Sequence, residues 1–102
     1  MLNDFSAEAP LWTTDVIARF EQALGTWAMR GNNYAVSLHH QLSQIQSIAD
    51  KREYILDQML PSLLNERGEA ALLPDTVALK GLVQTWLHDN GLSTRYLPLR
   101  AW

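Results

Sequence analysis

Two adjacent histidines, His39 and His40, have the greatest potential for chemistry in this sequence. A metal site on a helix needs ligands three or four residues apart and a third ligand nearby. Neighbouring residues on a helix point about 100° apart, so these two rings do not suit one ion. Positions 36, 43 and 44 offer no good ligand, and only folding could bring Asp50 or His88 close. We therefore expect surface histidines, no metal and no other cofactor.

A nucleophile is the next possibility, because Ser37 lies three residues before His40 and could contact it on a helix. A hydrolase also needs an orienting acid and an oxyanion hole, which backbone amides at a sharp turn usually form. The sequence contains no Gly-x-Ser-x-Gly motif and no predicted strand to carry one. We therefore expect that the protein is not an enzyme.

Residues 86–97 suggest a third possibility, the recognition of DNA bases. They place Gly91 in a turn, an apolar residue after it, Ser93 as a helix cap and an apolar residue four positions later. This pattern resembles the turn and second-helix start of the helix-turn-helix family. In that family the second helix enters the major groove. The resemblance implies that Thr94 and Arg95 contact bases.

Two features of the sequence weaken the DNA-binding alternative. Pro98 would fall in the first turns of the recognition helix and block its continuation. The net charge is −3, and the eight Lys and Arg residues are scattered apart from Lys51-Arg52. Nucleic acids and anionic membrane surfaces attract proteins mainly through a basic field. The charge therefore argues against both partners.

Helices must position any functional residue, and the first of them is predicted from Thr13 or Thr14 to Gly31. Either threonine can cap the helix, and Gly31 is a typical helix end. Residues 68–74 are interpreted as a linker, and a third helix is predicted after them, with Asp75 as its cap and Asn90-Gly91 as its end. Its expected buried face comprises Val77, Leu79, Leu82, Val83, Trp86 and Leu87.

The second predicted helix carries the longest apolar stripe. It begins at Asn32 or Asn33 and reaches a break or kink near residues 58–61, because Pro61 removes a backbone hydrogen bond. A short helix could then start at Pro61. The stripe recurs at the helical period and is widened on one flank by Ile48 and Ile55; its members are Tyr34, Leu38, Leu42, Ile45, Ala49, Leu56, Met59, Leu60 and Leu63.

The length of this second helix suggests a binding surface. At 1.5 Å per residue it would be about 40 Å long, whereas a chain of this size has a radius of gyration of roughly 13 Å. Either the helix bends or its apolar face packs against another chain. The predicted protein-interface residues are Leu42, Ile48, Arg52, Ile55 and Met59, with Trp102 as a secondary anchor.

Two of these residues keep a structural alternative. Arg52 interrupts the stripe, and its aliphatic stem could pack while the guanidinium stays at the rim. The functional alternative is an interface charge that pairs with a partner's carboxylate. Trp102 and Trp12 lie outside the predicted helices, so each is either a contact residue or part of the core.

Composition and length predict one all-α domain over residues 1–102. The chain is 47% hydrophobic and 19% charged, which is typical of a globular protein. We expect a bundle of three main helices plus one short helix, a loose lead-in at 1–11 and a packed C-terminal tail at 92–102. The chain has no cysteine, and its first residues show no basic stretch before an apolar run, so we expect a cytoplasmic protein.

These observations predict a non-catalytic protein-protein interaction module: an adaptor, a small chaperone, an inhibitor or an accessory subunit. It would bind another protein, or itself as a homodimer, through apolar helix faces. A small DNA-binding regulator that uses residues 86–97 is the alternative.

Overall fold

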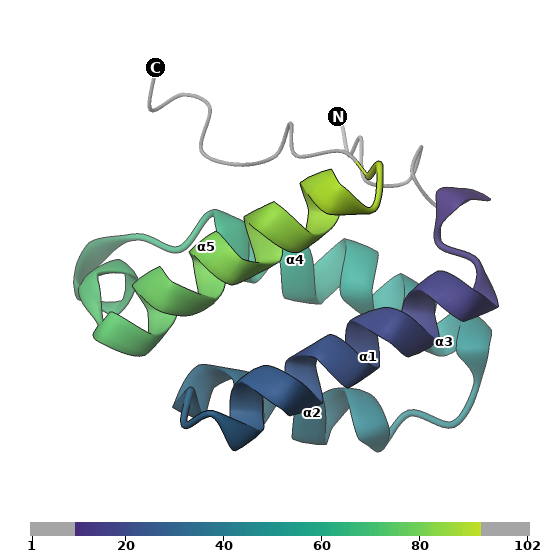
Figure 1. The fold of residues 1–102 in the computed structure, drawn as a ribbon, viewed down its shortest axis with the longest axis horizontal. Coiled ribbons are helices and arrows are strands. Elements are labelled where there is room, and N and C mark those ends of the chain that lie inside the picture. Colours follow the sequence, from purple (N-terminus) through teal and green to yellow (C-terminus); the bar gives the residue numbers. More distant parts are fainter. Residues whose placement is uncertain (1–9, 93–102) are drawn as a thin grey trace.

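The computed structural model describes residues 10–92, and there the chain folds as an all-α bundle (Figure 1). Helix α1 lies against α2, while α5 packs against both α2 and α4. The elements in chain order are α1 (Thr14–Met29), α2 (Asn33–Ser43), α3 (Ile48–Tyr54), the π-helical turn η2 (Ile55–Met59), α4 (Leu60–Leu64), the 3-10 turn η3 (Gly68–Leu72) and α5 (Pro74–Asp89).

Side-chain caps set the start of α1 and of α2, as the sequence predicts. The Thr13 hydroxyl accepts a hydrogen bond from the Val16 amide at 3.3 Å. The Asn32 side-chain oxygen accepts from the Ala35 amide at 2.9 Å. Each bond satisfies one of the amides that a helix N-terminus leaves unpaired. Between the two helices, Gly31 has a φ of +102°, a backbone conformation that residues with a Cβ rarely adopt. The resulting turn places α1 and α2 side by side.

The second predicted helix is two helices, so the prediction of one continuous helix up to Pro61 is wrong. Of the two alternatives for a helix about 40 Å long, a bend or a partner that covers its face, the structure shows a bend. The helix stops at Ser43 and restarts at Ile48. Ser47 caps the new helix, because its hydroxyl accepts from the Asp50 amide at 3.2 Å. The molecule measures 33 Å along its longest axis, which a helix of the predicted length would exceed. The break lets the chain turn back and bury both halves of the stripe.

The irregularity predicted near Pro61 takes the form of the π-helical turn η2. Here the Leu60 amide donates to the Ile55 carbonyl, one residue further back than in an α-helix. A proline ring clashes with the carbonyl four residues earlier in a regular helix, and a π turn relieves that crowding. The helical path therefore continues through Pro61 to Leu64 instead of ending there.

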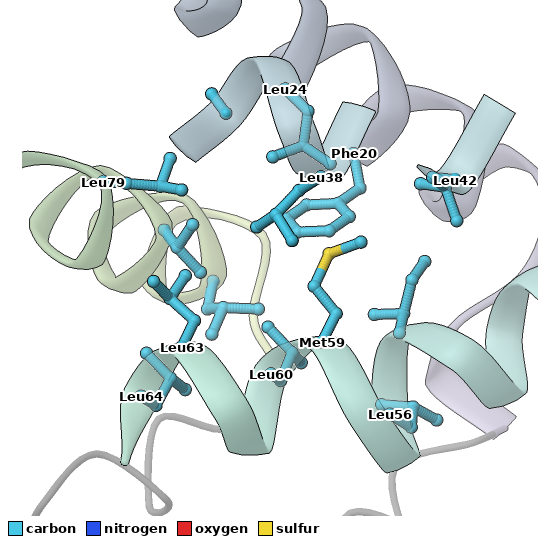
Figure 2. Close-up of a cluster of buried hydrophobic side chains, with 14 of the residues drawn as sticks. Phe20, Leu24, Leu38, Leu42, Leu56, Met59, Leu60, Leu63, Leu64 and Leu79 are labelled. Atoms are coloured by element: carbon cyan, nitrogen blue, oxygen red, sulfur yellow. The ribbon is translucent and has the colours of Figure 1, made fainter. Parts of the chain in front are cut away.

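The core lies where α1, α2, η2, α4 and α5 meet. Figure 2 shows Phe20 of α1, Leu38 of α2, Met59 of η2 and Leu79 of α5 converging on one region. Each of these four side chains is buried. Burying such a side chain contributes about 1.5–3 kcal/mol each. The stripe of the second predicted helix supplies a large share of this core, with the chain folded back upon itself.

Helix α5 differs from its prediction in its cap and in its buried face. Leu73 is the cap residue and Pro74 is the first helical residue, so the prediction that Asp75 caps this helix is wrong. The buried residues of α5 are Thr76, Leu79, Val83 and Leu87, whereas Val77 and Leu82, predicted to be buried, are exposed. At 100° per residue, Val77 lies about 200° from Leu79, on the opposite side of the helix.

No helix within residues 10–92 combines the length and the apolar character needed to cross a membrane. Most of the predicted C-terminal tail, residues 93–102, and most of the predicted lead-in, residues 1–9, lie outside the described residues.

Candidate functional site

Three of the predicted interface residues lie inside the protein's own core. Leu42 and Ile55 expose none of their surface, and Met59 exposes 2%. In Figure 2 the Met59 side chain extends toward Phe20 of α1. The expectation that a partner covers this stripe is therefore wrong for these three residues. The broken helix lets one chain bury them.

Two further predicted interface residues, Ile48 and Arg52, have structural roles at the edge of the core. Ile48 is half-buried and packs against the core. The Arg52 guanidinium donates from Nε to the Trp12 carbonyl oxygen at 2.8 Å, so this charge ties the segment before α1 to α3. Beside it, Lys51 pairs with Glu21 of α1 at 2.6 Å. The hydrogen bond to Trp12 agrees with the alternative in which Arg52 has a structural role, because its guanidinium binds a group of the same chain.

The predicted anchor Trp102 and the predicted base-contacting residues Thr94 and Arg95 lie outside the described residues. The described part of the helix-turn-helix segment ends in a turn after α5. Here Asn90 follows the helix and Gly91 has a φ of +71°. This confirms the predicted helix end, and the DNA-binding alternative stays a prediction.

The histidines do not form a site with other chemistry-bearing residues in the described part. His40 is exposed, while His39 is half-buried and packs against α1 at Gly25. A Cβ at Gly25 would lie 3.2 Å from Nε2 of His39, so the glycine permits this close approach. Within residues 10–92 no hydrogen bond joins Ser37 to His40, and no three acidic or histidine side chains are grouped to hold a metal ion.

Trp12, one of the two tryptophans that the sequence left open, belongs to an aromatic cluster in the core. Its exposed fraction is 1%. The Trp12 and Phe20 rings meet edge to face at 5.4 Å, and the Phe20 and Trp86 rings lie 5.0 Å apart. Such aromatic pairs stabilise a fold beyond their buried area. Trp12 is therefore a structural residue within the described chain.

A cleft of about 480 Å³ opens between the start of α2 and the segment that leads into α5. Its walls are mostly apolar. The lining residues are Asn33, Tyr34 and Ser37 of α2, Glu66 after α4, Ala70 of η3, and residues 73–76. Cavities of 300–1,000 Å³ with apolar walls and a few polar groups are typical of binding sites. This cleft is the best candidate for a functional site.

Cross-linking hydrogen bonds fix the relative position of the two sides of the cleft. The Asn32 side-chain amide donates to the Asp75 backbone carbonyl at 3.0 Å. In return, the Asp75 carboxylate accepts from the Asn33 backbone amide at 3.0 Å. Both bonds join the N-terminal ends of α2 and α5. Leu73 is extended, as the residue before a proline tends to be, and this turns its side chain into the cleft wall.

Tyr34 is the cleft residue whose ionisation is changed by its surroundings. Burial raises the pKa of the Tyr34 hydroxyl above its usual value, and the Glu66 carboxylate and the nearby Tyr54 add to that rise. Both effects disfavour a negative charge on the phenol oxygen. The Tyr34 hydroxyl is therefore a neutral hydrogen-bonding group beside a carboxylate at neutral pH.

Three exposed apolar side chains lie within or directly beside residues 73–76, the segment that lines the cleft. Leu72 exposes 77% of its surface, and Leu73 and Val77 each expose 56%. In the described part, the other large exposed apolar residues are spread over α1, α2 and α5 and the segment before α1; they are Leu11, Met29, Val36 and Leu82. Contiguous exposed apolar surface marks interaction sites more reliably than single exposed residues do. We call Leu72, Leu73 and Val77 the rim cluster.

No pattern in the sequence predicted the cleft or the rim cluster. The cleft joins residues from three separate segments, and no sequence spacing reports such a juxtaposition. The exposure of Val77 could have been predicted, because at 100° per residue it lies on the opposite side of the helix from Leu79. For Leu72 and Leu73, the interpretation of residues 68–74 as a linker hid two consecutive leucines that a linker does not require.

Comparisons with known proteins give no match: no family model, no curated protein and no solved structure matches this chain.

Proposed function

We propose that this chain is a non-catalytic protein-binding module that binds a different protein through the α2–η3–α5 cleft and the rim cluster. The observation that carries the proposal is an apolar-walled cleft beside the exposed side chains of the rim cluster, Leu72, Leu73 and Val77. A cytoplasmic location stays part of the proposal.

The cleft and the rim cluster have the features of an interaction hot spot. A partner side chain that fills a concave apolar site loses its water on all sides, and nearby apolar contacts keep water out. The cleft provides the concave site and the rim cluster provides the surrounding contacts. The hydrogen bonds of Asn32 and Asp75 hold both sides in place before binding. A preformed site reduces the entropy that binding costs.

Charge favours a different protein over a second copy of this chain. The cleft is lined by the carboxylates of Glu66 and Asp75 and by no basic side chain. A symmetric dimer would bring the same surface of each copy together, and like charges facing each other at an interface oppose binding. The occupant is therefore expected to carry the opposite charge.

Site-specific photocrosslinking tests the proposal directly. A photoreactive phenylalanine analogue replaces Leu73, and the protein is irradiated in an extract of the cells that produce it. We expect a discrete heavier product that contains one second protein. The same product should disappear when Val77→Asp is added, because a buried unpaired carboxylate would oppose binding at the rim.

A matched control uses the same analogue at Met29, which is 89% exposed, is the last residue of α1 and does not line the cleft. This position should give no such product. If positions 73 and 29 give the same products, the cleft is not the binding surface. A product that contains only this chain would show a homodimer and would overturn the choice of a different protein as occupant.

A further inference from the structure

We propose that the partner presents a Lys or Arg side chain, flanked by large apolar residues, and that this cation enters the cleft beside Tyr34 and Glu66. This inference rests on the proposed function and names the chemistry of the partner. Its basis is the combination of apolar walls, an aromatic ring and unbalanced negative charge in one cavity.

The negative charge of the cleft is not neutralised from within the described chain. Glu66 forms no ion pair with any residue in 10–92, and Asp75 uses one oxygen to accept from a backbone amide. Arg67 follows Glu66 in sequence but does not line the cleft. A cation that enters the cavity would therefore meet Glu66 and Asp75 and no basic side chain of the lining.

The walls suit the rest of a long basic side chain. Lys and Arg bury their aliphatic stems against apolar surface while the charged end reaches a polar group. Ala70, Leu73 and Pro74 provide the apolar wall, and the Tyr34 ring lies on the other side of the cavity. A cation close to an aromatic face gains further attraction. An uncharged apolar side chain would fill the same space without using either carboxylate.

The flanking residues of the partner follow from the rim cluster. Leu72 and Val77 flank the cleft on η3 and α5, and both are largely exposed. Apolar residues on either side of the partner's cation would cover them. A short extended or helical segment with Lys or Arg between large apolar residues would fill the cleft with its cation and cover the rim cluster with its apolar side chains.

Selection from a random peptide library displayed on phage tests this inference with the full chain as the target. We expect the selected peptides to be enriched in Lys or Arg next to Leu, Ile, Phe or Trp. Replacement of that cation by norleucine should weaken binding about two- to fivefold, as measured by fluorescence polarisation. Added salt should reduce the difference between the two peptides.

Two protein variants locate the effect. Glu66→Gln keeps the shape of the side chain and removes its charge, so it should reduce the preference for the cation over norleucine, while Asp75 and the Tyr34 ring remain in the cleft. Glu69→Gln is the matched control, because Glu69 is exposed in η3 and does not line the cleft. It should keep the preference.

The outcomes separate this inference from the proposed function. Peptides that lack a cation, but that lose binding to Val77→Asp, would overturn the inference and support the cleft as a binding site. Peptides that bind Val77→Asp as well as the natural protein would overturn both. A preference for the cation that Glu66→Gln leaves unchanged would overturn the assignment of Glu66 as the group that receives it.

Discussion

Replacement of Asn32 by alanine should be among the most damaging changes to a polar residue of this protein. Asn32 is buried, and its side chain makes two hydrogen bonds: it caps α2 at the Ala35 amide and holds the Asp75 carbonyl of α5. Loss of an N-cap costs about 1 kcal/mol, within a range of about 0.5–2 kcal/mol. Loss of the second bond adds roughly 1 kcal/mol. Asn32→Ala should therefore lower the free energy of unfolding by about 1.5–3 kcal/mol.

The adjacent Asn33 provides a matched control for this prediction. It is the same residue type, and the sequence allows either asparagine to cap α2. In the structure Asn33 is exposed, and its backbone amide, which alanine retains, makes the bond to Asp75. Asn33→Ala should change stability by less than about 0.5 kcal/mol.

Urea denaturation followed by circular dichroism measures both variants, and thermal unfolding provides a second readout. For a chain of this size, the Asn32→Ala change corresponds to a fall of roughly 6–24 °C in Tm. Equal losses for the two variants would refute the argument, because they would show that the cap and the bridge to α5 do not depend on Asn32.

Three further predictions test other parts of the account. Ile55→Ala should lower the free energy of unfolding by about 2–5 kcal/mol, because the Ile55 side chain is fully buried. Ile48 is only half-buried, so Ile48→Ala should lower it by roughly 1 kcal/mol. Equal small losses in urea denaturation would place Ile55 on the surface. Gly81→Ala should raise stability by about 1 kcal/mol in the same assay, because a Cβ there meets open space in α5, and Gly25→Ala should gain less, because a histidine ring lies 3.2 Å away. The raised pKa of Tyr34 means that the folded state holds the phenol proton more tightly than the unfolded state, so this contribution to stability is complete below pH 10.0 and is lost as pH rises through the folded pKa. Urea denaturation from neutral to alkaline pH should show a shallower decline for Tyr34→Phe, and an identical decline would contradict the assignment.

Local signals in the sequence were sufficient to predict the all-α class and several helix ends. The side chains of Thr13 and Asn32 cap helices, and the backbone conformation of Gly91 ends one. Each of these interactions spans only a few residues. Helix boundaries of this kind depend little on the rest of the fold. Their prediction therefore succeeded without knowledge of the tertiary structure.

The break between α2 and α3 was missed because it preserves the apolar spacing. Leu42, Ile45 and Ile48 are three residues apart, so the pattern continues across four residues that are not helical. A signal was present in Ser47 followed three residues later by Asp50, a pairing that is typical of a helix start. The missed break caused the larger error, since it turned core residues into a predicted interface.

The candidate cleft could not be derived from sequence patterns because it depends on tertiary contacts. Asp75 shows this most clearly: its type and position suggested a cap for its own helix, but its carboxylate reaches the Asn33 amide of α2. Periodicity describes one element at a time. Neither periodicity nor capping rules indicate which helix ends meet.

The most direct test of the central claim is a map of the binding surface by NMR, with the partner segment identified by crosslinking or a selected peptide. Backbone amide shifts are followed while the ligand is titrated into the labelled chain. The account predicts the largest changes at residues 33–37, 66–70 and 72–77, with small changes at the buried residues 55–59. Changes centred on the exposed groove between α1 and α2, around Met29 and Val36, would contradict the assignment of the cleft as the binding site.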